Sequence, residues 1–167
     1  NIAENAGGPR AVKYGITREY VTGIEAVLPN GEVVRYGGKT VKNVAGYDLA
    51  HFFVGTEGTL GIVTQATLRL LPLPEYRVDL LVPFDSFSAA AETVSEIIRG
   101  KKIIPTVLEF MDRPVVKACE QLLGHSLPFA EAEAQLIIGI DGNSKSQVDA
   151  DYETVAELCL ARGAADV

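Results

Sequence analysis

The chain has 167 residues, 47% of them hydrophobic, and a formal net charge of −7 from 22 acidic and 15 basic side chains. This length suits one ordinary domain or two small ones, and the apolar content is enough for a packed core. The acidic balance argues against nucleic acid as a partner. No apolar run is long enough for a transmembrane segment.

The chain opens on Asn1 rather than Met, and NIAENAGG reads like the middle of a structural element, so we expect an internal fragment of a longer protein. Cys119 and Cys159 fall on apolar positions of predicted helices, which indicates free core thiols in a reducing compartment such as the cytoplasm. His51 and His125 match no metal-ligand spacing, and we expect no metal site.

The first fifteen residues predict a loop, because the pair Gly7 and Gly8 precedes Pro9 and neither a helix nor a strand continues through such a sequence. Arg10 and Lys13 follow the loop. They could face an anion or lie on a solvated loop edge, which is the commoner fate of such charges.

A β-hairpin is predicted next. A strand begins at Tyr20, residues 29–31 form the turn signal Pro-Asn-Gly, and residues 33–36 supply the return strand. A polar stretch over residues 39–46 then leads to a predicted helix over residues 47–54, whose apolar side chains at Leu49, Phe52 and Phe53 have helical spacing.

The stretch GTEGTLGIVT, residues 55–64, is the most informative motif. Its first glycine, Gly55, stands where a helix C-cap glycine belongs. Glycines let main-chain amides approach a ligand closely, and successive amides in such turns form anion-binding concavities. The alternative is a tight turn that launches a strand and binds nothing.

The strand that follows alternates clearly. Ile62, Ala66, Leu68 and Leu70 share one face, and we expect that face to lie on a core. Two prolines end the strand, and residues 71–75 are the predicted domain boundary, because prolines stiffen a connection and prevent regular pairing.

After this boundary, strands alternate with amphipathic helices. Strands are predicted over residues 77–82, 106–110 and 135–140. The predicted buried stripes of the three helices are Phe87, Ala91, Val94 and Ile98; Val115, Cys119 and Leu122; and Val148, Tyr152, Val155 and Cys159. The predicted N-caps are Asp85 or Ser86, Asp112, and Ser144 with Gln147. This pattern predicts an α+β arrangement with helices on one face of a sheet.

Glu109 and Asp112 are two acidic residues near the end of a predicted strand. They could hint at acid/base chemistry, but the favoured explanation is that Asp112 is a helix cap and Glu109 is solvated or hydrogen-bonded.

Three stretches together resemble the FAD-linked oxidases with a PCMH-type flavin domain. They are NIAENAGG at the start, the block GGKTVKNVAGYDLAHFFVGTEGTLGIVTQATLRLLPLP, and LEFMD at residues 108–112. Within that family they are most similar to the group of the glycolate oxidase D-subunit and the D-lactate dehydrogenases.

The resemblance implies two parts. Residues 1–74 would be the C-terminal part of an FAD-binding domain, made of antiparallel strands with helices, and residues 75–167 the N-terminal part of a ferredoxin-like cap domain. The implied flavin contacts are Ala3, Asn5, Ala6, Gly7, Gly8, Gly55, Glu57, Gly58, Thr59, Leu60, Gly61 and Val63. The family's diphosphate loop and histidine cluster have no counterpart in this sequence, so we name no catalytic residue.

The resemblance also implies an activity. FAD would accept a hydride from a small 2-hydroxy acid such as glycolate or D-lactate, and electrons would pass to a partner such as an iron–sulfur subunit. The protein would be cytoplasmic, and any attachment to the inner membrane would come through partners. Two alternatives remain open: a folded remnant that binds no cofactor by itself, and an interaction module whose open sheet edges recruit a partner.

Overall fold

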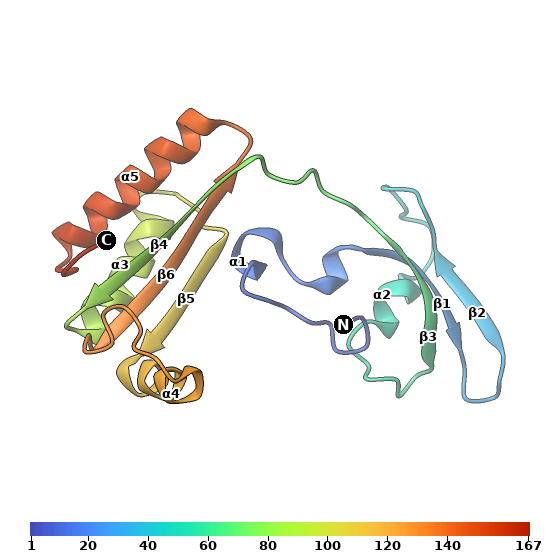
Figure 1. Ribbon diagram of the computed structural model, residues 1–167. Helices are drawn as coiled ribbons and strands as arrows, with labels where there is room; N and C mark the ends of the chain where they lie inside the picture. Colours follow the sequence, from blue (N-terminus) through green and yellow to red (C-terminus); the bar gives the residue numbers. More distant parts are fainter. The chain divides into compact units, whose positions relative to one another are not determined.

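A computed structural model describes every residue from Asn1 to Val167 and divides the chain into two compact units (Figure 1). The first unit comprises Asn1–Ala11 and Gly15–Pro72, and the second comprises Val12–Tyr14 and Leu73–Val167. The main division falls within the proline-containing segment at residues 71–75. The assignment of Val12–Tyr14 to the second unit has no signal in the sequence.

The first unit is built on a three-stranded antiparallel sheet in the order β2-β1-β3. The strands are β1 (Val21–Val27), β2 (Val33–Gly37) and β3 (Ile62–Leu68). The hairpin between β1 and β2 is confirmed: Gly31 has a φ of 84° and its amide donates to the carbonyl of Leu28 at 2.8 Å.

One short helix, α2 (Leu49–Phe53), covers the core of this sheet. Ala50 and Phe53, one helical turn apart, pack with Val54 against β1. The helix is shorter than the predicted 47–54, and of its three helically spaced apolar residues Phe53 is buried, whereas Leu49 is 36% and Phe52 62% exposed. With little more than one turn of helix, only residues spaced like Ala50 and Phe53 can face the sheet.

The buried face of strand β3 is the opposite of the predicted one. Val63 packs against the core of the first unit, whereas Ile62 is 62% exposed and Leu68 is 50% exposed. Alternation identifies the two faces of a strand, but register decides which one is buried, and a shift by one residue exchanges them. Here the register places Val63 opposite the buried Ala26 of β1.

The second unit is a three-stranded antiparallel sheet in the order β4-β6-β5 with helices packed on it (Figure 1). Its strands are β4 (Tyr76–Phe84), β5 (Val107–Asp112) and β6 (Ala134–Gly142). Its helices are α3 (Phe87–Arg99), α4 (Arg113–Leu123) and α5 (Lys145–Ala161). The α+β prediction is confirmed. The short helix α1 (Ala11–Tyr14) interrupts the loop predicted over the first fifteen residues, and the short element η1 (Thr17–Glu19) follows it.

The core of the second unit lies where α3 and α5 cover one sheet face. It consists of Val82, Phe84, Ala90, Ile97, Ile103, Ala134, Leu136, Ile138, Ile140, Val148, Val155, Leu158 and Cys159. Side chains at alternate positions of β4 and β6 meet the helices there. This is the pattern expected of a sheet with one covered face.

Helix N-caps were predicted better than helix faces. Ser86, Asp112 and Ser144 each accept a hydrogen bond from the amide three residues on, as predicted. The buried stripe of α3 lies one residue earlier than predicted, at Ala90, Thr93 and Ile97. The large side chain of Phe87, which suggested the wrong stripe, instead packs edge to face on Phe110.

The predicted stripe of α4 is also wrong. Val116 is the buried residue of this helix, whereas Val115 and Leu122 are exposed and Cys119 is half-buried. Helix α4 contacts β5. Val148, Val155 and Cys159 of α5 are buried as predicted, and Tyr152 is half-buried.

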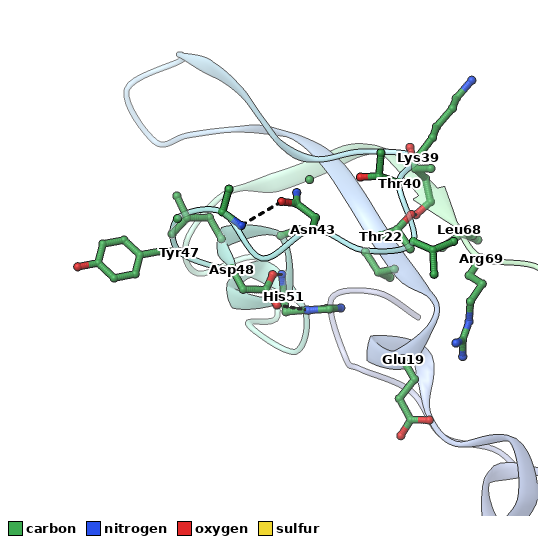
Figure 2. A pocket seen from close by; sticks show the side chains of 18 residues that line it. Glu19, Thr22, Lys39, Thr40, Asn43, Tyr47, Asp48, His51, Leu68 and Arg69 are labelled. Carbon is green, nitrogen blue, oxygen red and sulfur yellow. Dashed lines mark hydrogen bonds and ion pairs between the residues drawn. The ribbon is translucent and has the colours of Figure 1, made fainter.

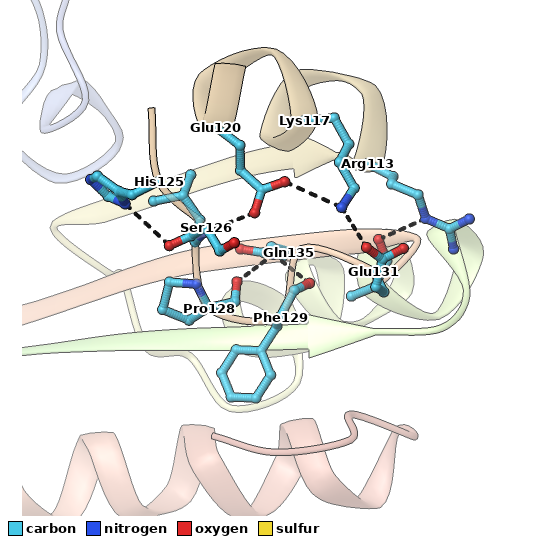
Figure 3. A network of polar contacts seen from close by, with 11 residues as sticks. Arg113, Lys117, Glu120, His125, Ser126, Pro128, Phe129, Glu131 and Gln135 are labelled. Carbon is cyan, nitrogen blue, oxygen red and sulfur yellow. Dashed lines mark hydrogen bonds and ion pairs between the residues drawn. The ribbon is translucent and has the colours of Figure 1, made fainter. Parts of the chain in front are cut away.

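The loop between α4 and β6 is held by buried and charged groups (Figure 3). The buried Gln135 amide donates to the carbonyls of Pro128 and Phe129 at 3.1 and 2.8 Å. The Glu120 carboxylate accepts from the Leu127 amide, and Lys117 forms ion pairs with Glu120 and Glu131. The loop is therefore tied to α4 and to the start of β6.

Asp141, near the end of β6, holds the Val12–Tyr14 segment. Its carboxylate lies 2.6 Å from the Lys13 ammonium and accepts from the Tyr14 hydroxyl at 2.8 Å. Burial works to raise the pKa of Asp141, but the Lys13 ammonium and the Thr106 and Tyr14 hydroxyls outweigh it and leave the pKa below its usual value. The pair therefore stabilises the fold above about pH 4, and this contribution is lost as the pH falls further.

No helix in the chain is both long and apolar enough to cross a membrane. Cys119 and Cys159 are both free thiols, and only Cys159 is fully buried.

We expect the two thiols to react very differently. Burial raises the pKa of Cys159 to about 11, so at pH 8 only about one part in a thousand is thiolate, the reactive form. A thiol-labelling assay on the folded protein should modify Cys119 and leave Cys159 until denaturant is added. Cys119→Ser is the control and should abolish the fast phase; fast labelling of Cys159 in that variant would contradict the packing of α5.

Candidate functional site

The two predicted glycine loops meet in the first unit. The Gly55 amide donates to the carbonyl of Ile2 at 3.0 Å, and the Glu57 amide donates to the carbonyl of Ala3 at 2.8 Å. These two bonds join segments that are distant in sequence into one continuous surface.

The backbone of both loops depends on left-handed residues. Gly55 and Gly58 have φ values of 84° and 78°, and the non-glycine residues Asn5 and Glu57 both have φ near 51°. A Cβ at Gly55 would also lie 3.1 Å from the Cβ of Asn5. Glycine is thus required at Gly55 by conformation and by the close approach of the first loop.

Thr17 and Arg18 of η1 hold the two loops through hydrogen bonds. The Arg18 guanidinium donates to the carbonyl of Val54 at 2.8 Å, and the Arg18 amide donates to Oδ1 of Asn5 at 2.9 Å. The amide and hydroxyl of Thr17 both donate to the carbonyl of Ala6. Sequence reasoning missed both residues, because their partners lie on other segments and no local motif marks them.

A hollow of about 470 Å³ lies where the loops join. Its lining is Asn1, Ile2, Ala3, Phe53, Thr56, Gly58, Gly61, Ile62 and Val63. Pockets for small ligands usually have volumes of a few hundred Å³ with mostly apolar walls, and this hollow fits that description. It is large enough to contact part of a dinucleotide.

The predicted contact residues fall into two groups. Ala3, Gly58, Gly61 and Val63 line the hollow. The remaining predicted residues do not line it: Asn5, Ala6, Gly7, Gly8, Gly55, Glu57, Thr59 and Leu60. Leu60, for example, packs against the core of the first unit. The lining residues that were not predicted are Asn1, Ile2, Phe53, Thr56 and Ile62, of which Ile2, Thr56 and Ile62 each adjoin a predicted residue in sequence.

Only some of the backbone amides in the two glycine loops are available to a ligand. The amides of Gly55, Glu57 and Thr59 already donate to carbonyls of the chain. The amides of Gly7, Gly8, Gly58, Leu60 and Gly61 have no acceptor within the protein. An anionic or carbonyl-bearing ligand would satisfy such donors.

A second hollow, also about 470 Å³, lies beside the polar stretch at residues 39–46 (Figure 2). Its charged side chains are of both signs, including Lys39, Asp48, His51 and Arg69. His51 lies 2.5 Å from the Asp48 carboxylate and holds the pKa of Asp48 below its usual value. These two groups therefore satisfy each other.

The acidic residues Glu109 and Asp112, considered from the sequence for acid/base chemistry, line neither hollow. Asp112 is the N-cap of α4, where its carboxylate accepts from the Val115 amide at 3.0 Å, and Glu109 is exposed. The structure contains no cluster of three or more His, Cys, Asp or Glu side chains that could hold a metal ion. Lys13, one of two basic residues considered as anion contacts, pairs with Asp141 instead.

Family comparisons match both units. Residues 73–167 match the model described as FAD linked oxidases, C-terminal domain, and residues 1–37 match the model described as FAD binding domain. The first match covers more than half of the chain. The second includes the first glycine loop and ends before the second one begins.

Curated relatives align along the full chain. A glycolate oxidase subunit GlcD from Bacillus subtilis is 48% identical over 167 residues, covering 100% of this chain and 35% of the relative. A D-lactate dehydrogenase from Anaerostipes hadrus is 40% identical, covering 100% of this chain and 36% of the relative. The chain thus spans about a third of the length of these relatives.

Solved structures show the same fold. An alkyldihydroxyacetonephosphate synthase superposes with a TM-score of 0.74 at 24% identity, covering 98% of this chain and 32% of that one. The structure titled Physcomitrella patens BBE-like 1 superposes with a TM-score of 0.61 at 16% identity, covering 99% of this chain and 31% of that one. At these identities the likeness concerns the fold alone.

We expect Gly55→Ala to be more destabilising than Gly31→Ala. Both glycines have a φ of 84°, but a Cβ at Gly31 meets nothing within 4 Å, whereas one at Gly55 meets Asn5. Gly31→Ala should lower the free energy of unfolding by roughly 1–2 kcal/mol for backbone strain alone. Gly55→Ala should cost about 1 kcal/mol more from overpacking. Urea denaturation followed by circular dichroism measures both, and equal losses would show that the loops do not meet.

Proposed function

Since the chain belongs to the FAD-linked oxidases, we propose that it forms one wall of the FAD site in a longer enzyme that oxidises a small 2-hydroxy acid. Glycolate and D-lactate are the substrates that the names of its relatives indicate. Bound FAD would supply the acceptor for the hydride that leaves the hydroxyl-bearing carbon.

The observation that carries this proposal is the junction of the two glycine loops. Residues chosen from the sequence as flavin contacts, Ala3 from one loop and Gly58, Gly61 and Val63 from the other, line a single hollow. Two turns whose only role is to start a strand need not line the same hollow.

The residues present fit part of a flavin dinucleotide. The unpaired amides of Gly7, Gly8, Gly58 and Gly61 are donors suited to a phosphate or a ring carbonyl. Ile62 and Val63 supply an apolar edge. Gly55 and Glu57 would contribute through the shape of the loop, because their own amides hold the first loop in place.

We assign the two parts of the chain to two domains of the enzyme. Residues 1–74 would be the C-terminal part of the FAD-binding domain, and residues 75–167 the N-terminal part of the cap domain. The match of residues 73–167 to the C-terminal domain of the FAD-linked oxidases supports this assignment. Proton removal and substrate binding would then rest on residues outside this sequence.

The electron acceptor would be a partner subunit. One relative is named a subunit of glycolate oxidase, which supports assembly with other chains. We propose an iron–sulfur subunit as the acceptor and a cytoplasmic location, with any membrane association made through such partners.

A second candidate function is a cofactor-free interaction module. Both sheets end in open edge strands, β2 and β3 in the first unit and β4 and β5 in the second, and open edges can pair with another chain. Size-exclusion chromatography with and without an iron–sulfur partner distinguishes the two functions. Complex formation by protein that takes up no FAD would favour the module.

The proposed function predicts a substrate-reducible flavin. The longer enzyme, purified and kept anaerobic, should show a flavin absorption band that glycolate or D-lactate bleaches and that L-lactate leaves unchanged. Gly55→Ala should lower the flavin content severalfold, whereas the matched control Gly31→Ala should retain it. Protein that shows no flavin band and takes up no added FAD would contradict the proposal.

A further inference from the structure

Arg18 contacts both glycine loops of the first unit from the middle of η1. Its guanidinium donates to the carbonyl of Val54 at 2.8 Å, directly before Gly55. Its backbone amide donates to Oδ1 of Asn5 at 2.9 Å. The side chain thus reaches one loop and the main chain reaches the other, and all of these residues belong to the same compact unit.

These contacts complete a closed ring of hydrogen bonds. The carbonyl of Ile2 accepts from the amide of Gly55 at 3.0 Å and from the amide of Asn5 at 3.1 Å. From Asn5 the ring continues to the Arg18 amide. From the Arg18 guanidinium it returns to the peptide unit of Val54 and Gly55, whose amide begins the ring. Three segments that are distant in sequence therefore hold one another, and the loss of a single bond opens the ring.

The bond from the Arg18 guanidinium is the one that a side-chain change removes most cleanly. Val54 is 1% exposed, so water has little access to its carbonyl. A buried carbonyl that loses its donor is costly, and a charged donor forms a stronger bond than a neutral one. Nη2 of Arg18 also lies 3.9 Å from the point that a Cβ on Gly55 would occupy, and Cβ of Asn5 lies 3.1 Å from the same point. The guanidinium and the first loop therefore both pack on Gly55.

We propose that Arg18 is a positioning residue for FAD, which orders the two glycine loops against each other by fixing the peptide unit of Val54 and Gly55. A flexible loop must be ordered when a ligand binds, and this ordering weakens affinity, so a ring that orders the loops beforehand strengthens binding. Arg18 does not line the hollow, so it acts through the loops. This inference rests on the proposed FAD site, but its structural part can be tested without FAD.

The two bonds of Arg18 can be removed separately. Arg18→Met keeps the amide and most of the side-chain length but removes the donor to Val54. Asn5→Gly removes the acceptor of the Arg18 amide, and glycine readily takes the φ of 51° that Asn5 has. Because both changes open the same ring, their combined effect should be smaller than the sum of the two.

A matched control lies on β2 of the same unit. Arg35 pairs with Glu25 of β1, its side chain is 77% exposed, and it does not line the hollow. Exposed pairs contribute little, because water competes for both charges. Arg35→Met therefore removes the same charged group from the same unit and leaves the ring intact.

The first measurement is amide hydrogen exchange of the 167-residue chain without FAD, read by NMR. Arg18→Met should speed exchange of the Gly55 and Glu57 amides about tenfold, because a buried carbonyl loses its charged donor. Asn5→Gly should act in the same direction, and the double variant should fall short of the product of the two effects. Arg35→Met should change neither amide. Unchanged exchange of both amides in Arg18→Met would overturn the role of the ring.

The second measurement is the FAD affinity of the longer enzyme, by titrating flavin-free protein. Arg18→Met should weaken FAD binding about tenfold, because binding must then also order the loops. Arg18→Lys keeps a charged donor and should recover part of the affinity, and Arg35→Met should bind like the unaltered enzyme. A general loss of packing would weaken binding equally in Arg18→Lys and Arg18→Met, and that result would contradict the proposal.

The outcomes separate this inference from the proposed function. Faster exchange with unchanged FAD affinity would overturn the positioning role while leaving the FAD site intact. Weaker affinity with unchanged exchange would mean that Arg18 acts on FAD directly, and would also overturn it. If the unaltered enzyme binds no FAD, the proposed function fails and the positioning role fails with it. Faster exchange, weaker affinity and recovery in Arg18→Lys together support the role.

Discussion

Two backbone hydrogen bonds, from Gly55 to Ile2 and from Glu57 to Ala3, hold the candidate site together. They can form only because Gly55 takes a left-handed conformation and has no Cβ to collide with Asn5. Glu57 takes the same conformation with a side chain, which is a strained arrangement of the kind that functional sites often retain. The hollow lined by residues of both loops lies at this junction. The junction also gives the glycines of the second loop a structural role that does not require them to bind phosphate directly.

Features set by neighbouring residues could be predicted from the sequence. The hairpin turn and the caps at Ser86, Asp112 and Ser144 depend on residues within a few positions, and each was predicted correctly. The buried faces of α3, α4 and β3 depend on which neighbour covers them, and these predictions failed. In α3 the largest apolar side chain, Phe87, suggested a stripe that the smaller Ala90, Thr93 and Ile97 in fact form. Residue size marks hydrophobicity, but it does not report how a helix is rotated against its sheet.

The candidate site, like the fold, could be predicted from the sequence only in part. The types of residue in the two glycine loops indicated where backbone and cofactor could come close, and the loops do share one hollow. The side chains that hold them could not be predicted, because Arg18 reaches Val54 and Lys13 reaches Asp141 across long stretches of chain. A basic residue in a loop looks the same in sequence whether it faces solvent, a phosphate or a buried carboxylate. Family membership adds FAD to this geometry, and the geometry indicates which groups of the chain remain free to contact it.

The most direct test of this account is an amide NMR titration of the 167-residue chain with FAD. If the two loops form one wall of the cofactor site, FAD should shift the amides of Ala3, Gly7, Gly8, Gly58, Leu60 and Gly61 together, with a single apparent affinity. Weak binding is enough, because the readout is the location of the shifts. Shifts confined to the polar hollow around Asp48 and His51, or no shifts at millimolar FAD, would contradict the account.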